Sequence, residues 1–140
     1  MAEQTIADHD NTFSLHPNRL GGCYISAERP QATRSFARRY RARYTVMTQY
    51  QMRPTDPEEA EIIQDLLRFF QKSLQLYELS DDALIDVMRM VNAAIYGFIA
   101  REQSELMTLN RSPDASYEVM LDALLVAIEY IWHNDKLKSR

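Results

Sequence analysis

Three long stretches with apolar residues at helical spacing follow one another in the second half of the chain, and each begins at a helix-capping residue. Asp56-Pro57 and Ser112-Pro113 place a capping side chain before a proline, and Ser80 precedes two aspartates. Capping side chains accept hydrogen bonds from the free N–H groups of a helix start, and a proline at the first position has no N–H to satisfy. Apolar residues then recur every three or four positions, which is the spacing of one helix face. The predicted helices cover residues 57–78, 80–107 and 113–133.

A fourth helix is predicted between Pro30 and Arg53. Its apolar face follows offsets of four, four and three residues, and Arg53-Pro54 ends it because proline disfavours helical geometry in the preceding residue. The members of that face are Phe36, Tyr40, Tyr44 and Met47, and the arginines predicted on the remaining surface are Arg34, Arg38, Arg39, Arg41 and Arg43. Residues 1–30 show no sustained period and predict an irregular lead-in, with at most a marginal strand over Cys23–Ser26. The expected fold is an all-α bundle of four main helices over residues 31–140.

Composition limits the class of protein. The 140 residues, 46% of them hydrophobic, suffice for one domain with a sizeable core. The single cysteine, Cys23, cannot form an internal disulfide, which favours a reducing compartment. No apolar run reaches the length of a membrane span. These observations predict a soluble, cytoplasmic protein with no membrane partner.

Charge is unevenly distributed along the chain. The formal net charge is −4, but residues 1–55 hold eight arginines against four acidic residues, whereas residues 56–140 hold eight basic residues against 16 acidic ones. Seven arginines occur between Arg29 and Arg53 without an intervening acid. This stripe indicates either a phosphate-binding surface or the solvated face of a helix.

The sequence offers little for catalysis. Glu129 and His133 are four residues apart and could bring two ligands to one metal, but a structural zinc site normally needs four. No glycine-rich phosphate loop or nucleophile motif is present, and Cys23 has no neighbouring base. We therefore expect no enzyme, no metal and no cofactor.

Apolar helix surface with interspersed polar and flexible side chains is abundant, and it can either fill an ordinary core or line a ligand cavity. Asn92 is the most informative of these residues, because a partly buried amide needs a hydrogen-bonding partner, either another protein group or a ligand. The candidate pocket residues are Tyr44, Met47, Phe70, Met88, Asn92 and Tyr96.

The last two predicted helices carry more apolar surface than one neighbour can cover. Small residues on the first of them would let another backbone approach closely. The surplus could be buried against the preceding helices or across a twofold axis, where two helices from each copy would form a four-helix homodimer interface. The candidate interface residues are Ala93, Gly97, Ala100, Tyr117, Leu121, Leu124, Leu125 and Ile128.

From about Arg39 onward the chain resembles the C-terminal ligand-binding and dimerisation domain of TetR/AcrR-type transcriptional regulators, in the subgroup named for a Trp…His-Gly signature. The stretch 91–99, followed by Arg101-Glu102, carries the resemblance: Gly97, Phe98 and Glu102 match the signature, while Asn92 and Tyr96 stand where Trp and His are usual. The segments 43–47, 56–58, 77–83 and 114–125 resemble the family in order and spacing.

The resemblance implies a homodimer that binds a small apolar ligand between its helices, with Asn92 and Tyr96 in the pocket. Family members carry a helix-turn-helix DNA-binding domain before this region, and residues 1–30 do not resemble one. The chain is thus expected to be either the effector part of a longer regulator or a protein without the DNA-reading part. Two other functions stay open: a helical homodimeric interaction module without a ligand, and a nucleic-acid contact through residues 29–53.

Overall fold

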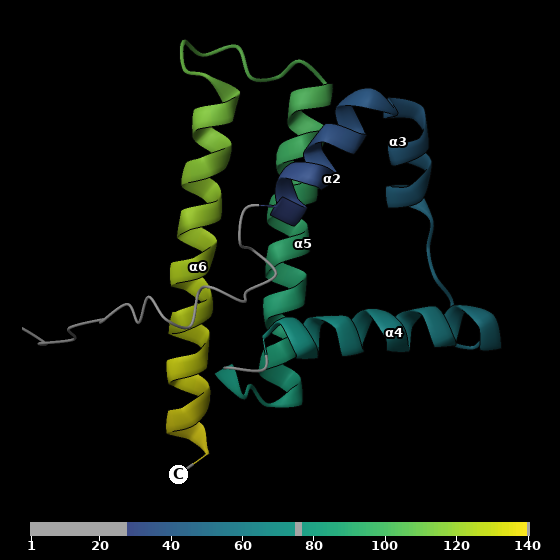
Figure 1. Cartoon of the computed structure of the whole chain (residues 1–140), viewed down its shortest axis with the longest axis vertical. Helices are drawn as coiled ribbons and strands as arrows, with labels where there is room; N and C mark the ends of the chain where they lie inside the picture. Colours follow the sequence, from purple (N-terminus) through teal and green to yellow (C-terminus); the bar gives the residue numbers. More distant parts are fainter. Residues whose placement is uncertain (1–27, 75–76, 140) are drawn as a thin grey trace, which may run out of the picture.

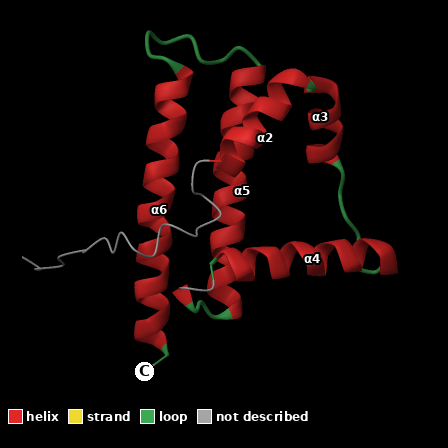
Figure 2. Ribbon diagram, in the orientation of Figure 1, coloured by secondary structure: helices red, strands yellow, loops and turns green. Residues whose placement is uncertain are grey.

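A computed structural model describes residues 28–74 and 77–139 of the chain (Figure 1). These residues form five helices and no strand (Figure 2). The helices are α2 (Glu28–Arg39), α3 (Arg41–Gln49), α4 (Pro57–Ser73), α5 (Asp81–Gln103) and α6 (Pro113–Lys138). The all-α prediction is confirmed for the described residues. The predicted lead-in up to residue 27, the marginal strand and Cys23 lie outside them.

The three predicted capping residues begin their helices as expected. Asp56 Oδ1 accepts hydrogen bonds from the backbone N–H groups of Glu58 and Glu59, at 3.0 and 3.2 Å. Ser80 Oγ accepts from the N–H of Ala83, and Ser112 is the N-cap of α6 in the same way. Local sequence therefore determines where α4, α5 and α6 start.

The predicted helix between Pro30 and Arg53 is instead two helices. The chain turns at Tyr40, where φ is −126° and ψ is 55°, and α3 ends at Gln49. The carbonyl of Ala37, which a continuous helix would bond to the N–H of residue 41, accepts from Gln103 Nε2 on α5. A tertiary hydrogen bond thus accompanies the break, and the four predicted face residues do not share one buried face.

Other boundaries differ by five residues or fewer. Helix α2 begins at Glu28, so Pro30 lies in its first turn, where a missing N–H costs nothing. Helix α5 ends at Gln103 rather than near residue 107, α4 ends at Ser73 rather than residue 78, and α6 continues through Lys138.

Helix α5 is the centre of the fold. It lies beside the antiparallel α6, α2 crosses it near its C-terminal end, and α4 lies across its other end (Figure 1). Its buried stripe consists of Val87, Val91, Ile95 and Ile99, and the facing residues of α6 are Tyr117, Leu121, Leu124 and Ile128. By length and hydropathy alone α5 could also cross a membrane, a property shared by the core helices of soluble bundles.

Candidate functional site

A buried arginine ties α2 to the two long helices. Arg34 is 3% exposed, and its Nε and one terminal nitrogen donate to the Glu102 carboxylate on α5 at 2.9 and 2.7 Å. Its other terminal nitrogen lies 2.7 Å from Asp114 Oδ1 at the start of α6. The guanidinium also lies over the rings of Phe98 and Tyr117. The prediction that Arg34 belongs to the solvated surface is therefore wrong, because two carboxylates and two rings enclose it.

The ion cluster shifts the pKa values of its members in the directions expected for paired charges. Hydrogen bonds from Arg34 lower the pKa of Glu102 below its usual value, although burial opposes the shift. Hydrogen bonds from Arg38 and then Arg34 lower the pKa of Asp114. The Arg34 pKa is raised, first by its bond to Glu102. All four groups are therefore charged at neutral pH.

A buried hydroxyl on α6 holds the start of α2 in place. Tyr117 Oη on α6 donates to the carbonyl of Pro30 at 2.8 Å, and the Tyr117 side chain is fully buried. The guanidinium of Arg41, just after the turn, donates to the carbonyl of Gln103. Helix α2 and the start of α3 are thus held on α5 and α6 at several points, and they position the residues predicted to form a pocket.

The six predicted pocket residues occupy different environments. Tyr44 and Phe70 are buried, Met88 and Asn92 are half-buried, and Met47 and Tyr96 are exposed. The structure brings Tyr44 and Tyr96 together, with ring centroids 6.0 Å apart. Tyr96 is 43% exposed, so this pair extends from the core to the surface between α3 and α5.

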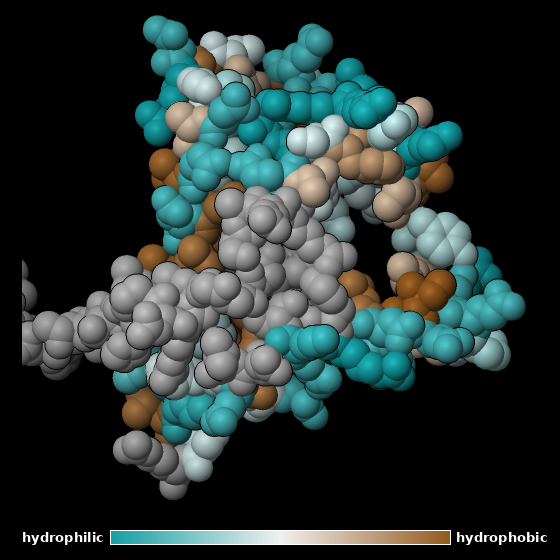
Figure 3. Space-filling model, viewed as in Figure 1, coloured by the Kyte–Doolittle hydropathy of each residue, from teal (hydrophilic) through white to brown (hydrophobic). Residues whose placement is uncertain are grey.

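The surface is hollowed beside α3 and α4. Figure 3 shows an opening bordered by α3, the linker after it and α4, with apolar atoms along its α4 side. Helix α3, the linker after it and α4 together expose the large apolar side chains Val46, Met47, Tyr50, Met52, Ile62 and Leu66. An opening with polar edges and an apolar wall is the kind of surface that takes a small apolar ligand.

Tyr44 has an unusual environment within this region. Its side chain is 5% exposed, and its hydroxyl has no hydrogen-bond partner among the described residues. Burial raises its pKa far above the usual value, so the hydroxyl stays protonated. A buried hydroxyl without a partner costs about 1–3 kcal/mol.

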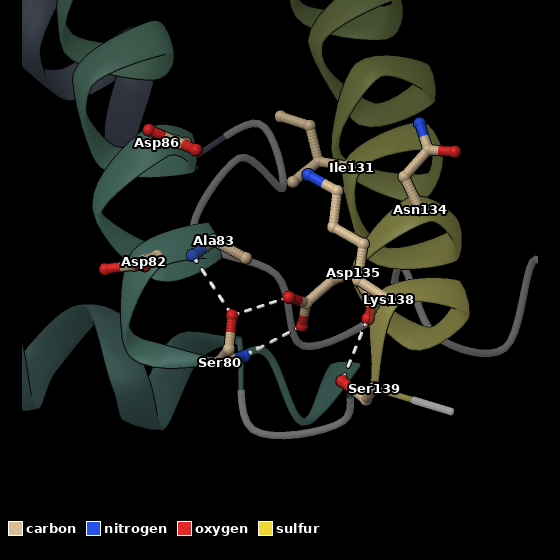
Figure 4. Close-up of a pocket in the computed structure, with 9 residues that line it drawn as sticks. All are labelled: Ser80, Asp82, Ala83, Asp86, Ile131, Asn134, Asp135, Lys138 and Ser139. Carbon is tan, nitrogen blue, oxygen red and sulfur yellow. Dashed lines mark hydrogen bonds between the residues drawn. The ribbon is translucent and has the colours of Figure 1, made fainter.

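Further cavities lie elsewhere among the described residues. One of about 440 Å³ lies between the N-terminus of α5 and the C-terminus of α6, where the Asp135 carboxylate accepts from the N–H and hydroxyl of Ser80 (Figure 4). Another, of about 280 Å³, lies between α4 and α5 and includes Leu67 and Ile85. None of the six predicted pocket residues lines either cavity.

The residues considered as metal ligands are separated by their environment. Glu129 is buried, whereas His133, one turn later on α6, is exposed. Within residues 28–74 and 77–139, no group of three or more His, Cys, Asp or Glu side chains is placed to hold a metal ion.

The predicted interface residues divide into two groups. Ala93, Gly97 and Ala100 on α5 are exposed, and a Cβ built at Gly97 would meet no heavy atom within 4 Å. Four of the five predicted on α6 are buried within the single chain, and Leu125 is half-buried. The buried four, Tyr117, Leu121, Leu124 and Ile128, pack in the core with α5 and retain no surface for a second copy.

Helix α6 exposes a different apolar stripe, which the sequence interpretation missed. Its members follow offsets of four, three, four and seven residues and are Val119, Ala123, Val126, Tyr130 and Leu137. The spacing was visible in the sequence, but the stronger apolar face on the opposite side of the helix concealed it. Apolar residues at alternating steps of four and three are the pattern of a helix that packs along a partner helix, and here the exposed His133 interrupts that pattern between Tyr130 and Leu137.

Comparison with known families gives one match: the model described as "Tetracyclin repressor-like, C-terminal domain" covers residues 30–124. Comparison with curated proteins and with solved structures gives no significant match.

Proposed function

The chain belongs to the tetracyclin repressor-like C-terminal domain family, and we propose that it forms a homodimer through the outer faces of α5 and α6. We also propose that it binds a small apolar ligand at the opening beside α3 and α4. Effector sensing and dimerisation are both typical of the family. The family is regulatory rather than enzymatic, and its members bind DNA through a separate domain. Its regulators are soluble and cytoplasmic, which is the location proposed for this protein.

The observation that carries the dimer proposal is that α5 and α6 each expose a stripe of residues opposite their buried face. With about 3.6 residues per turn, Ala93 and Gly97 lie on the opposite side of α5 from Glu102, which contacts α2. On α6, Val126 and Tyr130 lie opposite the buried side, which carries Leu121 and Ile128. The α5 stripe consists of small side chains and the α6 stripe of larger apolar ones, so two copies could pack closely.

Substitution within the α6 stripe tests the dimer. Val126→Lys would place a charge in the proposed interface, and we expect the mass measured by light scattering after size exclusion to fall from that of a dimer to that of a monomer. Val46→Lys is the matched control, because Val46 is an exposed helical valine on α3. A wild-type chain that is monomeric at micromolar concentration contradicts the proposal, as does a dimer unaffected by Val126→Lys.

The ligand proposal is supported by the contact between Tyr44 of α3 and Tyr96 of α5, together with the exposed apolar side chains of α3, the linker after it and α4. A ligand there would contact α3 and α5 together, and α3 follows α2 directly at the Tyr40 turn. A shift of α3 would therefore act on α2, which the Arg34 cluster attaches to α5 and α6. A ligand can shift the equilibrium between two positions of α3 only by the difference between its binding free energies for them, which is typically 1–3 kcal/mol.

Thermal unfolding with a panel of small apolar compounds tests the ligand. A ligand at about 100 times its Kd stabilises the folded state by about 2.7 kcal/mol, which raises the melting temperature measurably. Asn92→Leu should reduce the shift given by a bound compound, whereas Asn134→Leu, which changes a half-buried asparagine of α6, should leave it unchanged.

The second candidate function is a homodimeric interaction module that takes no small molecule. The observation in its favour is that the described cavities contain none of the predicted pocket residues. A dimer that gives no thermal shift with any compound of the panel would select this function.

A further inference from the structure

The turn between α2 and α3 carries a basic cluster that the proposed function does not use. We define the basic corner as Arg39, Tyr40 and Arg43. The two guanidinium carbons lie 5.4 and 5.5 Å from the centroid of the Tyr40 ring, and all three side chains are exposed. Neither arginine forms an ion pair with any residue in the described ranges. Two like charges thus lie close together without an internal counterion.

The neighbouring arginines differ in this respect. Arg34 and Arg38 are paired with Glu102 and Asp114, and Arg41 donates to a backbone carbonyl. Glu102 and Asp114 are therefore already neutralised by Arg34 and Arg38. These two carboxylates do not cancel the positive charge of the basic corner.

The start of α3 adds to this positive potential. No side chain caps the helix at Tyr40, and its first residues, Arg41 to Arg43, include no acid. The free N–H groups of a helix start carry a partial positive charge and bind phosphate well. The opposite end of the molecule is acidic, because Asp82, Asp86 and Asp135 outnumber Lys138 around the cavity of Figure 4. Such an asymmetric charge distribution orients a polyanion toward the corner.

From these observations we propose that the basic corner binds the phosphate backbone of duplex DNA. Guanidinium groups bind phosphate through two parallel hydrogen bonds, and a tyrosine hydroxyl can donate to a third oxygen. The Tyr40 ring is occupied by both guanidinium groups and by Phe36, whose ring centroid lies 5.2 Å away. Proteins that bind single strands stack the bases on free aromatic faces, and the Tyr40 ring has no free face of this kind. The basic corner therefore favours contact with the phosphate backbone of a duplex, which carries no sequence preference. The contact would be separate from the DNA-binding domain typical of the family and does not depend on the proposed dimer or ligand.

Fluorescence anisotropy with a labelled duplex of about 20 base pairs and arbitrary sequence tests the proposal between about 50 and 200 mM salt. We expect binding that weakens with salt, and each phosphate contact contributes about 0.9 to the slope of log K against log salt. Arg39→Gln with Arg43→Gln should lower the magnitude of the slope by about 2. Arg39→Lys with Arg43→Lys should keep most of it, because the charge remains while the paired hydrogen bonds are lost.

The matched control removes two cations elsewhere: Arg68→Gln with Lys72→Gln, both exposed on α4. Circular dichroism and the melting temperature should show all variants folded. Neither corner arginine has an ion pair to lose, and the pair that the control loses, between Arg68 and Asp65, is exposed and contributes little to stability. The proposal is overturned if the wild type does not bind the duplex at about 50 mM salt, or if the control weakens binding as much as the corner variant. It is also overturned if a single strand of equal length, or an acidic polypeptide of equal charge, binds more tightly than the duplex.

Discussion

The Arg34 guanidinium on α2 and the Glu102 carboxylate on α5 form a two-bond ion pair, at 2.7 and 2.9 Å, inside a protein that places most of its other charges in solvent. This pair and Asp114 hold three helices at one junction. The pair carries two of the predictions that follow.

Glu102→Ala should destabilise the chain by about 3 kcal/mol, because it leaves the buried Arg34 without its principal partner. The free energy of unfolding from urea titration, followed by circular dichroism, measures the loss. Arg38→Gln is the comparison: this guanidinium contacts the same carboxylate but is half exposed, and we expect a loss below about 1 kcal/mol. Equal losses in the two variants would show that burial of Arg34 does not determine the strength of the junction.

Stability should also fall in acid through the same carboxylate. The pKa of Glu102 is below its usual 4.5 in the folded chain, so its contribution is complete above that value and is lost as the pH falls through the lowered folded pKa. The difference in unfolding free energy between the wild type and Glu102→Gln should therefore shrink as the pH falls from 7 toward the acid range. A difference that stays constant over that range would contradict the assignment.

Two buried tyrosines should respond to loss of the hydroxyl in opposite directions. Tyr117→Phe leaves the Pro30 carbonyl without its donor and should cost about 1 kcal/mol. Tyr44→Phe removes a buried hydroxyl that has no partner and should be neutral or stabilising by about 1 kcal/mol. Melting temperatures of both variants, measured side by side without added ligand, make the comparison. Destabilisation by Tyr44→Phe would mean that its hydroxyl is bonded in solution.

Gly97→Ala separates the stability of one copy from the association of two. In the single chain a Cβ at this position meets open space, so alanine should stabilise α5 by about 1 kcal/mol through helix propensity. In the proposed dimer the added methyl group would lie in the contact between small residues and weaken association. Unfolding measurements should show a higher free energy of unfolding for Gly97→Ala. Sedimentation over a concentration series should show a higher dimer Kd. An unchanged dimer Kd would place Gly97 outside the interface.

The sequence determined the helical class and the starts of α4, α5 and α6, because capping bonds reach only two or three residues along the chain. It also identified the small residues of α5 as one face that would meet another helix, and in the single chain Ala93 and Gly97 are exposed. Periodicity identified the stronger apolar face of α6 but not its role. Whether that face is covered by α5 or by a second copy depends on contacts between distant residues.

Tertiary contacts decided the rest. At the turn at Tyr40 the Ala37 carbonyl accepts from Gln103, which is 66 positions away, whereas local spacing alone predicted a continuous helix there. The burial of Arg34 likewise required Glu102 and Asp114 to meet it from two other helices. An arginine is costly to bury unless carboxylates compensate its charge, and a helical period does not reveal which distant carboxylates will be present.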